Sequence, residues 1–221
     1  MQDSPKLLRR HWEELSRRCV FPEQRSQAVF QLLLQAYAEP QRHYHTAQHI
    51  AECLALYSQI QHLLDDAPSL ALALWFHDAV YDPQAPDNEE RSAALMMQAC
   101  AGLLSEAQLR KASAWIAATK LHLCTDEPDL QYLLDIDLAV LAAGAARFAE
   151  YEAQICKEYA WVDAAQYQRR RREVLSSFYQ AQPLYQTVYF QQRFEQQAKR
   201  NLAARLVQEK ISRLLISSLK K

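Results

Sequence analysis

Glycine is nearly absent from this chain, because Gly102 and Gly144 are the only two among 221 residues. Sheet proteins need glycine in their tight turns, whereas helices joined by short loops do not. Alanine, leucine, glutamine, glutamate and arginine, which suit helices, are abundant. Two glycines are also too few for the phosphate-cradling loops of P-loop and dinucleotide-binding proteins. We therefore expect an all-α chain and exclude both of those nucleotide-binding classes.

Apolar residues recur at helical spacing along the chain. Val29, Leu32, Leu33 and Ala36 share one face of a helix expected from Pro22 to about residue 38. The other helices are expected to begin at Ser4-Pro5 and after Thr46, and to span about 69–79, 88–101, 105–119, 129–142 and 145–159, with a long helical tail from about 163. No repeat or linker interrupts this pattern, so we expect a single compact helical bundle over residues 1–221.

The tail carries an apolar stripe with spacings of four residues, which is typical of one buried helix face. Its members are Phe194, Ala198, Leu202, Leu206, Val207, Ile211 and Leu215. We expect this stripe to pack against the chain's own core, although a homodimer interface would have the same pattern.

Charge and cysteine content indicate a cytoplasmic protein. The formal net charge of −1 provides no overall field that would attract nucleic acid. The five cysteines are scattered, without a CxxC pair, which is typical of reduced thiols. The N-terminus has no apolar run like that of a signal peptide, and no stretch is long enough to cross a bilayer. We therefore expect neither membrane nor nucleic-acid partners.

Histidines and an acid occur where the surrounding sequence is otherwise apolar. The segment RHYHTAQH contains His43, His45 and His49, and the spacing of four residues places the last two on one helix face. His77 and Asp78 end the apolar run LALALWFHDAV. An imidazole and a carboxylate are costly there unless a partner satisfies them, and a bound cation would do so.

A second pair of acids, Asp135 and Asp137, lies in the apolar segment LLDIDLAVL. Two imidazoles and two carboxylates suit one divalent transition metal such as Mn, Fe, Co, Ni or Zn, with Mg as a further option. Four protein ligands would leave positions for water and substrate, as catalytic metal sites do. The residues themselves leave open whether His45 or His49, and whether Asp135 or Asp137, is the ligand.

The order of these motifs resembles that of the HD-domain superfamily of metal-dependent phosphohydrolases. Within these motifs the local sequence looks more similar still to one uncharacterised bacterial branch, usually called predicted HD-superfamily metal-dependent phosphohydrolases. The resemblance spans most of the chain, from about residue 10 to 207, and the segments that carry it are RHYHTAQHI, WFHDAVYDP, DNEERSA, ATKLH, LDIDLAVL and FEQQAKRNL. The resemblance implies an all-helical fold with a metal-site core over about 40–145 and C-terminal helices over about 145–217 packing on it. It also implies that the metal ligands are His49, His77, Asp78 and Asp137.

The resemblance further implies hydrolysis of a phosphate ester or anhydride in a small substrate, such as a nucleotide. A metal ion would polarise a phosphoryl oxygen and lower the pKa of a bound water towards 7. We expect cations within the motif segments to offset phosphoryl charge, and His122 to act as an acid or extra ligand. The predicted catalytic residues are Asp78, Asp82, Lys120 and His122, and the predicted substrate-binding residues are Arg42, His45 and Arg91.

Two other functions would use the same scaffold. One is a non-hydrolytic HD-type metal enzyme, such as an oxygenase or a hydratase, with His45 and His122 supplying ligands for a second metal. The other is a nucleotide-binding protein with a structural metal, because a fold does not by itself establish an activity.

Overall fold

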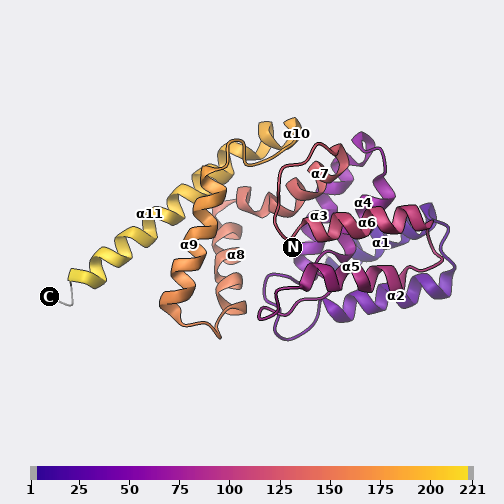
Figure 1. Ribbon diagram of the computed structural model, residues 1–221, viewed down its shortest axis with the longest axis horizontal. Helices are drawn as coiled ribbons and strands as arrows, with labels where there is room; N and C mark the ends of the chain where they lie inside the picture. Colours follow the sequence, from indigo (N-terminus) through magenta and orange to yellow (C-terminus); the bar gives the residue numbers. More distant parts are fainter. Residues whose placement is uncertain (1–3, 219–221) are drawn as a thin grey trace. The chain divides into compact units, whose positions relative to one another are not determined.

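The computed structural model describes residues 4–218, with the backbone alone for Ser4 and for 209–218. Every regular element in this range is helical (Figure 1), so the all-α prediction is confirmed. Segments labelled η are 3-10 helices, except η3, which is a π-helix. The elements are α1 (Ser4–Arg18), α2 (Glu23–Ala36), α3 (Ala47–Ile60), η1 (Gln61–Leu63), α4 (Ala67–Phe76), α5 (Asn88–Ala99), α6 (Glu106–Ala118), α7 (Pro128–Asp137), η2 (Leu138–Ala142), α8 (Ala145–Glu158), α9 (Ala164–Gln180), α10 (Val188–Phe190), η3 (Gln191–Glu195) and α11 (Gln196–Ser218).

The helices group into two compact units that meet in sequence between Asp137 and Leu138. The first unit contains α1 to α7, and the second contains η2 to α11. All of the predicted metal ligands belong to the first unit. That the C-terminal helices pack on the metal-site core to form one domain stays a prediction.

The first unit is built around α4, which contacts α1, α3, α5, α6 and α7. Every α4 residue except Pro68 is buried, which explains why this helix is apolar on all sides. Trp75 packs edge-on against Trp12 and Phe30, with ring centroids 5.5 and 6.0 Å apart. The apolar sequence therefore predicts the central position of this helix correctly.

The end of α4 differs from the expected position near residue 79. The helix ends at Phe76, and His77 is its C-cap. The carbonyl oxygens of Asp78 and Ala79 accept hydrogen bonds from the Arg42 guanidinium at 2.6 and 3.0 Å. Because this side chain satisfies the carbonyls, the chain can leave the helix there without exposing unpaired backbone groups.

The second unit has a polar as well as an apolar core. The buried carboxylate of Glu152 accepts hydrogen bonds from Arg171 and Arg205. Within the predicted tail stripe, Ala198 and Leu202 are fully buried, and α11 contacts η2 and α9 of the same unit. This part of the stripe packs on its own core, as expected.

The side chains of Ile211 and Leu215 lie outside the described residues, and a homodimer stays a prediction. Among the helices that the structure describes, none combines the length and apolar character needed to cross a bilayer.

Candidate metal centre

Three helix ends in the first unit bring the four predicted ligands together. His49 lies in the first turn of α3, whose start is capped by the hydroxyl of Thr46, as expected. His77 and Asp78 directly follow the last residue of α4, and Asp137 is the last residue of α7. Each ligand therefore lies at the end of an element, where its side chain can leave the apolar packing.

The donor atoms of these side chains are spaced like ligands of one ion. Nε2 of His49 and Nε2 of His77 are 3.0 Å apart. Oδ2 of Asp78 lies 3.4 and 3.1 Å from these two nitrogens. Oδ1 of Asp137 lies 3.2 and 3.4 Å from them. With metal–ligand bonds of about 2.1 Å, adjacent donors are about 3.0 Å apart in an octahedral site and about 3.4 Å apart in a tetrahedral one. The cluster could therefore hold a metal ion, and His49, His77 and Asp78 form a group whose donor atoms all lie within 4.8 Å of one another.

The second ring nitrogen of each histidine also has a partner. Nδ1 of His77 lies 2.9 Å from the carbonyl oxygen of Leu74. Because a carbonyl can only accept, this Nδ1 carries a proton, and in the neutral ring Nε2 has a free lone pair. Nδ1 of His49 lies 3.0 Å from the Tyr44 hydroxyl. Such partners are typical of metal-binding histidines, because they orient the ring towards the ion.

Electrostatics also favour a cation at this position. Burial lowers the pKa of His77, but the carboxylates of Asp78 and Asp137 outweigh it and raise that pKa well above its usual value. Burial also lowers the pKa of His49, but the neighbouring Cys53 and Tyr44 and the hydrogen bonds to the two carboxylates outweigh it and raise that pKa well above its usual value. Burial raises the pKa of both acids, but the imidazoles hold their pKa well below the usual range. The surroundings of both imidazoles thus favour a positive charge between the two carboxylates, and a metal ion would supply that charge.

Access to the cluster comes from the side of the carboxylates. The side chains of His49 and His77 are 2% and 1% exposed, whereas those of Asp78 and Asp137 are 18% and 15% exposed. The imidazoles therefore form the closed side of the centre. Solvent therefore touches the centre at its two carboxylates.

The structure places the alternative ligands that the sequence left open in different positions. Asp135 is also buried, but it is the carboxylate of Asp137 that meets the two ligand histidines. His49 lies within the cluster, whereas the ring of His45 stacks on Tyr81 with centroids 4.2 Å apart. After His77, His45 nevertheless contributes to lowering the pKa of Asp78. His45 is therefore a half-buried residue at the rim of the cluster, and its predicted contact with substrate stays a prediction.

One donor was missed in the sequence. Cys53 is buried on α3, and its Sγ lies 3.7 Å from Nδ1 and 3.8 Å from Nε2 of His49. His49, Cys53 and Asp137 form a second group whose donor atoms all lie within 4.8 Å of one another. The signal was the spacing of four residues between His49 and Cys53, which places both on one helix face.

His122 contacts the centre through Asp137. Its Nε2 lies 3.0 Å from Oδ2 of Asp137, the oxygen not shared with the ligand histidines. The backbone of His122 is left-handed, with φ of 49°, a conformation that is uncommon for residues other than glycine. The neighbouring Leu121 and Leu123 are exposed. This contact places His122 behind a ligand, so its predicted role as an acid or extra ligand stays a prediction.

Arg42, predicted to bind substrate, is instead buried and bonded to the protein. Its guanidinium donates to the carbonyl oxygens of His45, Asp78 and Ala79 at 3.1, 2.6 and 3.0 Å. Its Nε donates to the Glu39 carboxylate at 2.9 Å. These contacts tie the turn that carries a metal ligand to the segment before α3. Arg42 therefore positions the centre, and its contacts give no support to substrate binding.

The other predicted residues lie elsewhere in the described structure. The Lys120 ammonium donates to the Glu90 carboxylate at 2.6 Å. Arg91 is paired at 3.8 Å with Asp87 on the surface. Asp82 would lie one helical turn after Asp78 if α4 continued, but α4 ends at Phe76, and Asp82 lies in an exposed loop where its carboxylate accepts a hydrogen bond from the backbone of Gln84. In residues 4–218, none of these three side chains contacts the four ligands, and their roles stay predictions.

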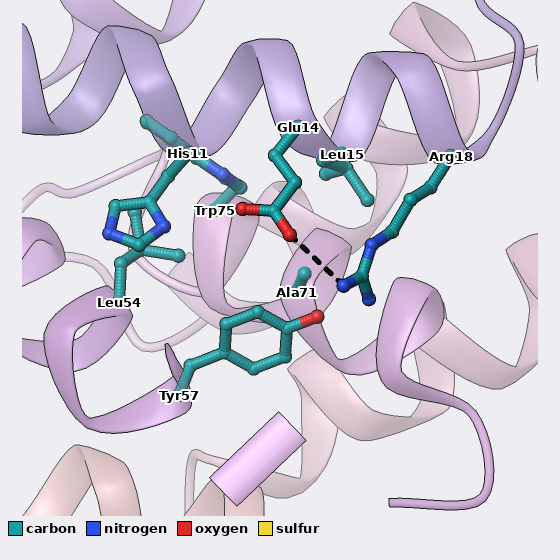
Figure 2. Close-up of a pocket in the computed structure, with 8 residues that line it drawn as sticks. All are labelled: His11, Glu14, Leu15, Arg18, Leu54, Tyr57, Ala71 and Trp75. Carbon is teal, nitrogen blue, oxygen red and sulfur yellow. Dashed lines mark hydrogen bonds and ion pairs between the residues drawn. The ribbon is translucent and has the colours of Figure 1, made fainter. Parts of the chain in front are cut away.

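A small crevice between α1, α3 and α4 is separate from this centre (Figure 2). Its volume of about 10 Å³ suits a single water molecule rather than a substrate. The crevice is lined by His11, Glu14, Leu15, Arg18, Leu54, Tyr57, Ala71 and Trp75. Nε1 of Trp75 is buried without a hydrogen-bond partner among the described residues, and such a water would be a suitable partner.

No protein-family model, no curated protein and no solved structure matches the chain. Membership of the HD superfamily therefore stays a prediction made from the motifs. What the protein does has to be argued from the donor cluster itself.

Proposed function

We propose that the protein is a metal-dependent hydrolase of a phosphate ester or anhydride. One divalent transition ion would bind to His49, His77, Asp78 and Asp137. The observation that supports this is the set of donor separations, which run from 3.0 to 3.4 Å. Two nitrogen and two oxygen donors suit Mn, Fe, Co, Ni or Zn, and they suit Mg less because Mg prefers oxygen ligands.

The bound ion would supply Lewis acidity and an activated water at neutral pH. Asp78, the more exposed acid, would bind the ion and accept a hydrogen bond that orients the attacking water. His45, at the rim, would donate a hydrogen bond to a phosphoryl oxygen of a small substrate such as a nucleotide. Lys120 and Arg91 would have to leave their carboxylate partners to do the same.

A second candidate is a metal centre that does not hydrolyse phosphate. A phosphoryl group needs positive charge around it, yet the guanidinium of Arg42 is bonded to three backbone carbonyls. The ammonium of Lys120 is bonded to a carboxylate and a carbonyl. These contacts favour an oxygenase or a hydratase on the same scaffold, whereas a metal-containing nucleotide-binding protein would need cations for the phosphates as a hydrolase does.

The test is metal content followed by turnover. Protein purified without chelator is expected to hold about one transition ion per chain, as a mononuclear site would. Protein loaded with Mn, Co, Ni or Zn is then assayed on p-nitrophenyl phosphate and on a panel of nucleotides. Asp78→Asn should abolish both metal retention and turnover, whereas Asp126→Asn, in an exposed loop, should change neither.

Each failure points to a different conclusion. Metal retention without turnover of any phosphorylated compound would favour the second candidate, which iron loading and equilibrium binding of nucleotides can then separate. Failure to retain any of the four metals would refute the proposed metal centre. Two ions per chain would contradict the mononuclear site and favour the dinuclear alternative.

A further inference from the structure

The hydroxyl of Tyr44 contacts the metal centre through one of its ligands. It lies 3.0 Å from Nδ1 of His49, and the tyrosine ring packs against the imidazole with centroids 4.8 Å apart. Tyr44 is only 5% exposed. The backbone N–H of Thr46 donates to the Tyr44 carbonyl at 2.7 Å, and the Arg42 guanidinium donates to the carbonyl of His45 at 3.1 Å. The turn before α3 therefore holds this hydroxyl in place.

The direction of the hydrogen bond follows from the nitrogen that would bind the ion. Nε2 of His49 lies 3.4 and 3.2 Å from the carboxylates of Asp78 and Asp137. An ion bound there takes the lone pair of Nε2, so that the neutral ring carries its proton on Nδ1. The Tyr44 oxygen is then the acceptor of that proton. The sulfur of Cys53 is 3.7 Å from the same Nδ1, so the hydroxyl is the closer partner.

The two ligand histidines have different kinds of partner at Nδ1. The partner of His77 is the carbonyl oxygen of Leu74, which can only accept, so the backbone fixes the tautomer of this ring with or without an ion. The Tyr44 hydroxyl can either accept a proton from Nδ1 of a neutral His49 or donate one to it. The tautomer of His49 can therefore follow the occupancy of the centre, whereas that of His77 is set beforehand.

We propose that Tyr44 is a positioning residue of the metal centre, whose hydroxyl oxygen accepts the Nδ1 proton of His49 and stabilises the tautomer that binds an ion through Nε2. Such a hydrogen bond orients the ring and makes the ligating nitrogen more basic. The inference rests on the metal centre of the proposed function, and it adds the side chain that controls one of the ligands.

The substitution Tyr44→Phe removes the acceptor and keeps the ring. The affinity for Zn²⁺, measured by competition with a chromogenic chelator, is expected to fall by about 10- to 100-fold. In ¹⁵N NMR spectra, the Zn²⁺-loaded wild-type protein should have His49 protonated on Nδ1, and this proton should exchange with water more rapidly in Tyr44→Phe. The control Tyr57→Phe removes a similarly buried hydroxyl that donates to the Ala67 carbonyl instead, and it should change neither the affinity nor the exchange.

The outcomes separate this inference from the proposed function. A wild-type protein that binds one equivalent of Zn²⁺ with His49 protonated on Nε2 refutes the role of Tyr44 and leaves the metal centre intact. Wild-type affinity or unchanged proton exchange in Tyr44→Phe refutes it as well, and so does an equal loss of affinity in Tyr57→Phe. A wild-type protein that binds no Zn²⁺, Co²⁺ or Mn²⁺ refutes both proposals. If circular dichroism shows that Tyr44→Phe is unfolded, the Zn²⁺-loaded wild-type protein carries the test, and an Nδ1 proton of His49 that exchanges as fast as that of free imidazole refutes the inference.

Discussion

Nε2 of His122 lies 3.0 Å from Oδ2 of Asp137, while Oδ1 of the same carboxylate meets the two ligand histidines. One carboxylate thus connects the buried imidazoles to a half-buried histidine from a strained turn. A residue held in the left-handed region costs free energy and persists where the surroundings require it. The left-handed backbone brings the imidazole of His122 to Oδ2 of Asp137. This contact leaves Oδ1 of the same carboxylate to face the two histidines.

Removal of this contact should weaken metal binding. His122→Ala frees the Asp137 carboxylate to rotate, and we expect the metal affinity to fall by about 10- to 100-fold, as for other partners of metal ligands. Competition against a chromogenic chelator measures the effect. His62→Ala, which alters an exposed histidine on η1, should leave the affinity unchanged. Wild-type affinity in His122→Ala would show that the contact does not position the ligand.

Metal affinity should respond differently when Asp135 and Asp137 are each changed to asparagine. Asp137→Asn removes a charged oxygen donor and should lower metal affinity by more than about 100-fold. Asp135→Asn alters a buried acid outside the donor groups, and should lower the Tm while metal affinity changes by less than about threefold. Isothermal titration with Mn²⁺ or Zn²⁺ and thermal unfolding separate the two effects. The reverse pattern would make Asp135 the ligand.

The metal-free protein should have a stability maximum in mildly acidic solution. The pKa of Asp78 and of Asp137 is lowered from 3.8, so their contribution is complete above that value and is lost as the pH falls through the lowered pKa. The pKa of His49 and of His77 is raised from 6.5. Their contribution is complete below that value and is lost as the pH rises through the raised pKa. Both contributions are present between about pH 4 and pH 6.5.

Metal binding should show the opposite dependence on the histidines, because an ion needs neutral imidazoles. The rise in Tm caused by Zn²⁺ or Mn²⁺ should therefore grow between about pH 5 and pH 8. Thermal unfolding across this range, with metal or with EDTA, measures both effects. A metal-free Tm that continues to rise above pH 7 would contradict the assigned protonation of the histidines.

Arg42 should be essential to the turn that carries Asp78. Arg42→Lys keeps the charge but loses the fork that bonds several carbonyls at once. We expect the free energy of unfolding to fall by about 2–4 kcal/mol, because buried carbonyls lose their partners. Urea unfolding measures this, with Arg110→Lys as the control, since Arg110 lies on an exposed part of α6. A loss below about 0.5 kcal/mol, typical of surface substitutions, would show that the clamp is dispensable.

Local sequence determined the helical class and most of the helices. The scarcity of glycine excluded sheets and phosphate loops, and periodic apolar residues located the helices within a few positions. The all-apolar segment around Trp75 predicted a central helix, which α4 is. Its end was predicted too late, because the contact that ends it comes from Arg42, whose hydrogen bonds reach across to the other segment.

The ligand set was determined only in part. Asp135 and Asp137 are two residues apart on α7, about 200° around the helix axis, so the sequence implies that they face opposite sides. Which side faces His49 and His77 depends on how α3, α4 and α7 pack, and no single helix pattern contains that information. The tertiary structure decided which of the two acids faces the histidines. It also brought Cys53, from within α3, and His122, from the turn after α6, to Asp137, because these contacts join segments that are distant along the chain.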